Sequence, residues 1–122
     1  MMNNKMPASP PKNDWSIQRR WKRYRVEVRL KVYFQQDGAQ TFTSGQGSDI
    51  SEGGMAAYVP MELNPGDTVE LELMFPYSKD PVHILAAIRN RNGFRFGLEF
   101  TRILPSDRDI LVRSLKALAL VQ

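Results

Sequence analysis

The 122-residue sequence contains no cysteine and only one histidine, His83. Without cysteine the chain can form no disulfide, no thiolate zinc site and no cysteine nucleophile. The absence is consistent with a reducing compartment, so we expect a cytoplasmic protein. A single histidine excludes a multi-histidine metal site within one chain, and we expect no metal and no other cofactor. No apolar run approaches the length of about 18 residues that a membrane-spanning helix needs, and residues 1–14 lack the apolar segment of a secretory signal.

Arrangements of side chains suited to catalysis are also missing. His83 is predicted to lie on a strand with no nucleophile motif around it, so we interpret it as a structural or surface residue. Glu70 and Glu72 alternate with apolar residues, which is typical of the solvated face of a strand rather than of paired acid–base carboxylates. No glycine-rich phosphate loop precedes a helix. We therefore expect that the protein is not an enzyme.

The positive charge is concentrated in one short segment. The net charge is +4 and the pI is about 9.6. Five of the 17 Lys and Arg residues lie within residues 19–25, which leaves twelve basic against thirteen acidic residues in the rest of the chain. A local positive field favours an anionic partner such as a nucleotide, a nucleic acid or a membrane surface.

The length indicates one domain that can bury a core of its own. Residues 1–17 are rich in Asn, Pro and Ser and predict a disordered tail, which leaves residues 18–122 as the folded domain.

Period-two alternation of apolar residues predicts an antiparallel β fold. A second strand starting near Ala39 should carry Phe42 inward, and a bulge or loop is expected at residues 44–47 because of the two glycines there. Residues 49–54 are interpreted as a loop. Turns are expected at residues 37–38, 64–67 and 92–93. The remaining strands are predicted at residues 25–34, 55–59, 69–75, 82–91 and 94–100.

The apolar period changes to that of a helix near residue 105. Ser106 and Asp109 have the spacing of a capping box, and Leu111, Leu115 and Leu118 recur on one helical face. Five or six strands followed by one helix predict an all-β fold, either a small barrel or a sandwich, closed by the C-terminal helix. The apolar residues 115–121 could belong to the core or to a dimer or partner interface.

The first candidate binding cluster is Arg19-x-x-x-Arg23, together with Arg20, Lys22 and Arg25. The planar guanidinium group suits phosphate oxygens and the O6/N7 edge of guanine, each of which it can bind with two hydrogen bonds. Arg19 and Arg23 precede the first strand, in a segment that could fold over a ligand. The alternative is a solubilising run at the edge of the domain.

The second candidate cluster is Asp49-x-Ser51-x-x-Gly54. An aspartate carboxylate can accept hydrogen bonds from the N1–H and N2 amino group of guanine, and a serine hydroxyl can donate or accept beside it. Gly53 and Gly54 permit a positive φ and a close approach of the backbone. The alternative is an ordinary turn, in which Asp, Ser and Gly are common for local reasons.

Taken together, the two clusters resemble the ligand motifs of the PilZ domain family. The members of this family are bacterial receptors for cyclic di-GMP. The family motifs are RxxxR before the first strand and [D/N]xSxxG after it, and they match Arg19 to Arg23 and Asp49 to Gly54 here. The segment Phe96-Gly97-Leu98-Glu99-Phe100 followed by a helix is also similar to the family. The resemblance covers about residues 18–121.

The resemblance implies a six-stranded antiparallel β-barrel of PilZ type and a cyclic di-GMP receptor or effector that signals to a partner protein. It implies that Arg19 and Arg23 bind phosphate and guanine, that Asp49 and Ser51 bind a guanine edge, and that Gly54 keeps the turn open. Arg20 and Gly53 are possible further contacts.

Two other functions remain open on the sequence. A small barrel could bind RNA or single-stranded DNA, with Trp21 and Tyr24 as stacking surfaces among the arginines. The charge ends at Arg25 instead of following a barrel face, which argues against it. The chain could instead be a protein-interaction module that binds no nucleotide. It could be a monomer or a homodimer, and we expect no membrane insertion.

Overall fold

The computed structural model describes residues 22–76 and 78–121, which form six strands and one helix. The elements are β1 (Tyr24–Gln36), β2 (Ala39–Ile50), β3 (Gly54–Tyr58), β4 (Thr68–Met74), β5 (Val82–Asn92), β6 (Arg95–Ile103) and α2 (Pro105–Val121). The predictions that fall on residues 1–21, among them the tail and the residues Arg19, Arg20 and Trp21, lie outside the described residues.

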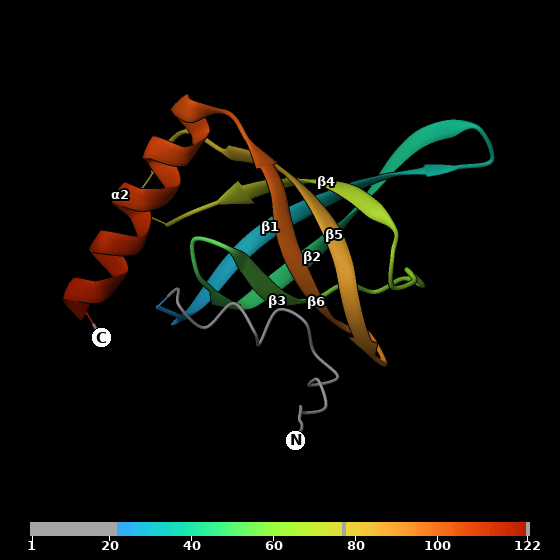
Figure 1. Cartoon of the computed structure of the whole chain (residues 1–122), viewed down its shortest axis with the longest axis horizontal. Helices are drawn as coiled ribbons and strands as arrows, with labels where there is room; N and C mark the ends of the chain where they lie inside the picture. The colour runs from blue at the N-terminus through green and yellow to red at the C-terminus, as the bar shows by residue number, and fades with distance from the viewer. Residues whose placement is uncertain (1–21, 77, 122) are drawn as a thin grey trace, which may run out of the picture.

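The six strands close into a barrel in the order β1-β2-β3-β6-β5-β4, and every neighbouring pair is antiparallel. The helix lies beside one end of the barrel, as Figure 1 shows. This arrangement confirms the predicted six-stranded antiparallel barrel with a C-terminal helix. Within the described residues, no helix combines the length and apolarity needed to cross a bilayer.

Alternate residues of the strands fill the barrel with aliphatic and aromatic side chains. On β1, Val28, Leu30 and Val32 are buried while the residues between them are exposed, which is the predicted alternation. The apolar face of α2 completes the core through Leu111, Leu115 and Leu118. Leu120 on the same helix is 88% exposed, so only part of the apolar C-terminal run belongs to the core.

The β1–β2 hairpin extends beyond the barrel on the side away from α2 (Figure 1). β1 pairs with β4 only from Arg29 to Tyr33, and β2 pairs with β3 only from Gln46 onwards, yet β1 and β2 stay paired as far as their turn. The turn has positive φ at Asp37 (53°) and Gly38 (79°), as the expected two-residue hairpin requires.

The expectation that Phe42 points inward was wrong. Phe42 is 51% exposed, because its part of β2 lies in the extended hairpin, where no core exists to receive it. Its ring packs against Tyr33 with a centroid separation of 5.5 Å.

No loop interrupts β2 at residues 44–47, because the strand is continuous from Ala39 to Ile50, and the bulge expected there begins at the last residue of this stretch, Gly47. The glycines in this stretch allow close packing. A Cβ at Gly45 would lie 2.7 Å from the carbonyl oxygen of Tyr58, and one at Gly47 would lie 2.5 Å from the Met55 side chain. Register shifts occur between Gly47 and Asp49 on β2 and between Arg25 and Val28 on β1.

Two further expectations need correction. The helix begins at Pro105, with the Arg108 amide donating to the Leu104 carbonyl, so Ser106 lies within the first turn and does not cap it. Proline suits this first position because its missing N–H would have no partner there. Phe94 belongs to the β5–β6 turn rather than to the last strand, and it is 53% exposed.

Truncation of a core leucine should destabilise the protein strongly. Leu98 is 1% exposed in the barrel, so Leu98→Ala should lower the free energy of unfolding by about 2–5 kcal/mol through lost burial and a residual cavity. The same change at the exposed Leu120 should have little effect. Urea denaturation of both variants measures this, and equal midpoints would contradict the core assignment.

Candidate functional site

The motif Asp49-x-Ser51-x-x-Gly54 forms the tight connection between β2 and β3. Asp49 belongs to β2, Gly54 starts β3, and only residues 51–53 lie between the strands, so the expected six-residue loop was too long. The Ser51 amide donates to the Gly54 carbonyl at 2.9 Å. The Ser51 hydroxyl accepts from the Gly53 amide at 3.1 Å and donates to the Gly54 carbonyl at 3.4 Å. Ser51 is fully buried, so in this structure its hydroxyl shapes the turn.

The positive φ considered for Gly53 and Gly54 is not adopted. Among the described residues, the glycines with positive φ are Gly38, Gly66 and Gly93. Gly54 has an extended backbone because it already pairs with Glu99 of β6, and the Phe100 amide donates to the Gly53 carbonyl at 2.9 Å. Both glycines are thus held by β6.

Asp49 lies at the surface beside two residues that the sequence did not single out for binding. Its Oδ2 accepts a hydrogen bond from the Arg95 guanidinium at 3.2 Å. The guanidinium carbon of Arg95 lies 5.9 Å from the ring centroid of the exposed Tyr58. Tyr58 and Arg95 are cross-strand partners on β3 and β6. Their proximity depends on the strand register, which no short motif reveals.

The start of β1 runs alongside this turn. Arg25 lies directly opposite Asp49, and Tyr24 lies opposite Ile50. Arg23 therefore lies, exposed, one residue before the strand and next to the β2–β3 turn. The structure brings Arg23 and the Asp49 motif to the same part of the barrel surface, although they are far apart in the sequence.

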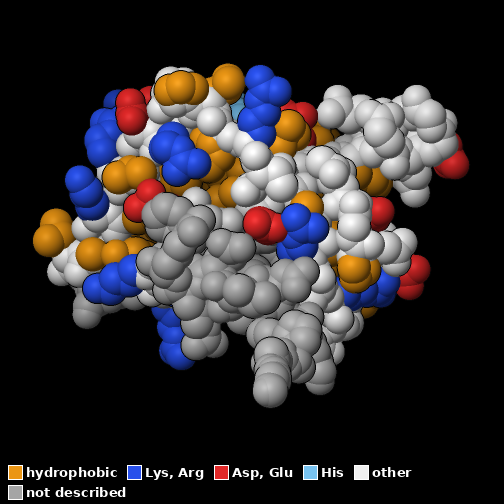
Figure 2. All heavy atoms as spheres, in the orientation of Figure 1, with side chains coloured by type: hydrophobic (Ala, Val, Ile, Leu, Met, Phe, Trp, Pro, Cys, Tyr) orange, Lys and Arg blue, Asp and Glu red, His pale blue; other side chains and the backbone are white. Residues whose placement is uncertain are grey.

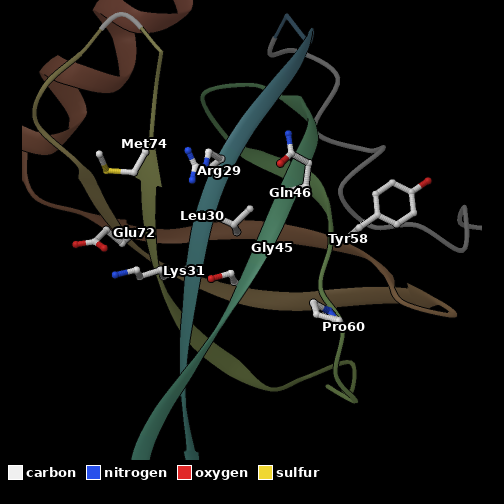
Figure 3. Close-up of a pocket in the computed structure, with 10 residues that line it drawn as sticks. Arg29, Leu30, Lys31, Gly45, Gln46, Tyr58, Pro60, Glu72 and Met74 are labelled. Carbon is white, nitrogen blue, oxygen red and sulfur yellow. The ribbon is translucent and has the colours of Figure 1, made fainter.

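Two adjacent hollows lie on the outer face of β1 and β2. One has a volume of about 680 Å³ and is lined by Arg25, Val26, Glu27, Gln46, Gly47, Ser48 and Tyr58. The other, of about 730 Å³, shares Gln46 and Tyr58 with it and continues past Arg29 and Lys31. Figure 3 shows the residues that line the second hollow, which come from β1, β2, β4 and the region around the end of β3. Hollows of this size are in the range of small-ligand sites.

The site is locally basic, and the expectation that the charge ends at Arg25 was wrong, because basic side chains continue along the outer face of β1, with Glu27 between them. Arg25, Arg29 and Lys31 lie on the outer face of β1, and Arg95 lies beside Asp49. On the face of the molecule in Figure 2, basic and acidic side chains are interspersed. This pattern suits a compact anion better than a long polyanion.

His83 has a structural role, as the sequence indicated. Its Nε2 lies 3.1 Å from Glu72 Oε2, and its backbone amide donates to Asp107 Oδ1 at 3.3 Å. These contacts connect β4 and β5 to the start of α2. Over residues 22–76 and 78–121, no group of three or more His, Cys, Asp or Glu side chains could hold a metal ion.

The described strands therefore form a small closed barrel with two hollows on the outer face of β1 and β2. The family model of the PilZ domain matches residues 17–117, so the chain belongs to the PilZ domain family. Domains of this family are binding and regulatory modules. No curated protein sequence matches the chain.

Several solved structures, two of them PilZ domains, have the same fold. The PilZ domain of YcgR from Escherichia coli, with c-di-GMP, has a TM-score of 0.64 at 20% identity, with 84% of this chain and 92% of that one covered. The PilZ domain of CeSA from a cellulose-synthesising bacterium has a TM-score of 0.61 at 19% identity, with coverage of 80% and 98%. The inhibitor of motility MotI/DgrA of Bacillus subtilis has a TM-score of 0.65 at 17% identity. The match covers 86% of this chain but only 52% of MotI/DgrA, so the chain spans about half of that protein.

Removal of the Ser51 hydroxyl should loosen the β2–β3 turn. Ser51→Ala leaves the Gly53 amide without its acceptor, so the free energy of unfolding should fall by about 1 kcal/mol. The matched control is Ser44→Ala at an exposed position of β2. Chemical denaturation measures the stability of both variants. If the midpoint of Ser51→Ala equals that of the control, the Ser51 hydroxyl does not stabilise the turn.

Proposed function

We propose that this chain is a cytoplasmic receptor for cyclic di-GMP, which binds against the β2–β3 turn and the outer hollow of β1 and β2. The observation that carries the proposal is the pairing of Arg25 with Asp49. It places an acidic group and the end of the basic segment beside each other at the edge of the hollow. Membership of the PilZ family and the fold shared with the c-di-GMP-bound domain of YcgR support it.

Each side chain has a role that follows from its chemistry. Arg23 binds a phosphate or the O6/N7 edge of a guanine, and Arg19, with Arg20 in support, adds to this from the preceding segment. Asp49 accepts from the N1–H and N2 amino group of a guanine. Ser51 and Gly54 set the turn that presents Asp49, so the buried Ser51 hydroxyl acts through the turn, and the half-buried Gly53 backbone is the further contact in this proposal.

Arg95 and Tyr58 extend the proposed site beyond the family motifs. Arg95 pairs with one carboxylate oxygen of Asp49 and lies near the Tyr58 ring. A guanine that hydrogen-bonds to Asp49 would enter next to both groups. Its face could then stack on the ring or on the guanidinium plane, each of which adds to affinity without competing for the Watson–Crick edge.

The interactions are sufficient in magnitude for a signalling affinity. A micromolar complex needs about 8 kcal/mol. Hydrogen bonds to charged groups contribute roughly 1.5–3 kcal/mol each, so two arginines, Asp49 and a stacked base can reach that total after the cost of ordering the basic segment before β1 on the ligand. That ordering also supplies the output, since a basic segment fixed over the ligand presents a new surface to a partner protein.

Single substitutions at the two motifs should weaken binding without unfolding the barrel. Arg23→Ala and Asp49→Ala should each lower the affinity for cyclic di-GMP by one to two orders of magnitude, or about 1.4–2.8 kcal/mol, because each removes a charged hydrogen-bonding group. Isothermal titration calorimetry with cyclic di-GMP measures this, with GTP and a short oligonucleotide titrated in parallel.

Matched controls are present elsewhere on the barrel. Glu62→Ala removes the carboxylate that pairs with Arg91, as Asp49→Ala removes the partner of Arg95. Arg113→Ala removes an exposed arginine from α2. Both controls should retain wild-type affinity. Wild-type affinity in Arg23→Ala or Asp49→Ala would show that the site is misplaced. Preference for the oligonucleotide, with a steep loss of affinity in salt, would favour nucleic-acid binding instead.

A further inference from the structure

The extended part of the β1–β2 hairpin leaves one strand edge open. A closed barrel normally has no free edge, because each strand is paired on both sides. Here residues 39–45 of β2 pair with β1 alone, since β3 meets β2 only from Gln46, opposite Tyr58. Gly45 marks where β2 separates from the chain that follows β3. Figure 1 shows this part of the hairpin standing clear of the barrel.

The opposite edge of the hairpin has neighbours. Phe34, Gln35 and Gln36 of β1 line a hollow together with residues of the β3–β4 connection, including Met61 and Leu63. Phe34 is also partly buried against the core. The open edge is therefore that of β2, and any strand that extends the sheet at the hairpin would add there.

The open edge lacks the features that normally prevent edge-to-edge pairing. Residues 39–45 read Ala-Gln-Thr-Phe-Thr-Ser-Gly and contain no charged residue and no proline. Natural edge strands usually carry a lysine, a proline or a bulge that blocks association. Thr, Phe and Ser are exposed or half-exposed here, and Phe42 with Tyr33 forms an aromatic pair on the outer face.

We propose that this edge pairs with the same edge of a second copy, giving a two-fold symmetric dimer with strand order β1-β2-β2-β1. When two copies of a strand pair antiparallel about a two-fold axis, each residue that precedes the axis position lies opposite the residue that follows it by the same number of positions in the other copy. With Phe42 at the axis, Thr41 faces Thr43 and Gln40 faces Ser44 of the other copy, so uncharged side chains meet throughout. Threonine pairs and aromatic pairs are favourable across strands. The Tyr33–Phe42 pairs of both copies then form one aromatic row.

This self-complementarity identifies a second copy as the occupant rather than a strand of another protein or another segment of the same chain. Residues 39–45 themselves carry no charge that would select a heterologous partner, although the Lys31 ammonium lies 5.1 Å from the Phe42 ring centroid and Ser44 and Gly45 line one of the two hollows. The paired segment is short compared with a standard interface, so the dimer should be weak and concentration-dependent.

Sedimentation velocity on the full chain, up to about 1 mM protein, tests the proposal together with two variants. Phe42→Lys places like charges at the two-fold axis and should weaken the dimer at least about tenfold. Phe94→Lys is the matched control, because Phe94 is equally exposed but lies in the β5–β6 turn. It should sediment as the wild type does. A monomeric wild type, a Phe42→Lys variant that dimerises normally, or equal losses in both variants would each overturn the proposal.

The absence of native cysteine allows an independent test of register. Single cysteines introduced in turn at positions 40–44 should form intermolecular disulfides fastest at the residue nearest the two-fold axis, with a fall-off on either side. Phe94→Cys gives the background rate. A flat profile at the background rate would overturn the proposal even if Phe42→Lys failed to fold.

Discussion

The antiparallel pairing of β1 with β2 is the constraint on which the site depends. It places Arg25 opposite Asp49 and Tyr24 opposite Ile50, so the end of the basic segment and the β2–β3 turn become neighbours. The core residues of β1 fix this register, because a slip by one position would expose Val28, Leu30 and Val32 to water. Burial inside the barrel thereby determines which polar groups meet on its outside.

The same two strands have different surroundings at their two ends. At the base of the hairpin, β3 and β6 lie next to the site, and Arg95 of β6 forms an ion pair with Asp49. At the tip, β1 and β2 have no further partner strands, and Phe42 is exposed. The hollow next to the β2–β3 turn contains no residue of the proposed dimer edge, whereas the second hollow includes Ser44 and Gly45 of that edge.

Much of the fold follows from local patterns in the sequence. Period-two alternation identified strands with one buried face, such as β1 and β4, and the Asp37-Gly38 dipeptide identified the first hairpin turn. The second hairpin turn is Gly93-Phe94, one residue later than the expected Asn92-Gly93, because Asn92 still pairs with Arg95. The motif residues of the turn were also visible, since Asp49 and Ser51 lie close together in the chain. Arg19 and Arg20 lie outside the described residues, so their roles stay predictions.

The errors have a common physical origin in non-local geometry. Phe42 continues an apolar pattern, but its part of β2 extends beyond the barrel. How far the hairpin extends depends on where β3 and β4 stop pairing with it, which the sequence of the hairpin does not show. Gly45 and Gly47 look like strand breakers, but they accommodate Tyr58 and Met55 from the neighbouring strand. Arg95 and Tyr58 join the site through cross-strand register, which sequence spacing does not encode.

The most direct test of the central claim, that one ligand bridges the basic segment and the β2–β3 turn, is hydrogen exchange with and without cyclic di-GMP. The account predicts that amides in residues 15–25 and 49–54 gain protection together at the same ligand concentration, while those of α2 do not change. Saturating binding that leaves residues 15–25 unprotected, or that protects a different face of the barrel, would contradict it.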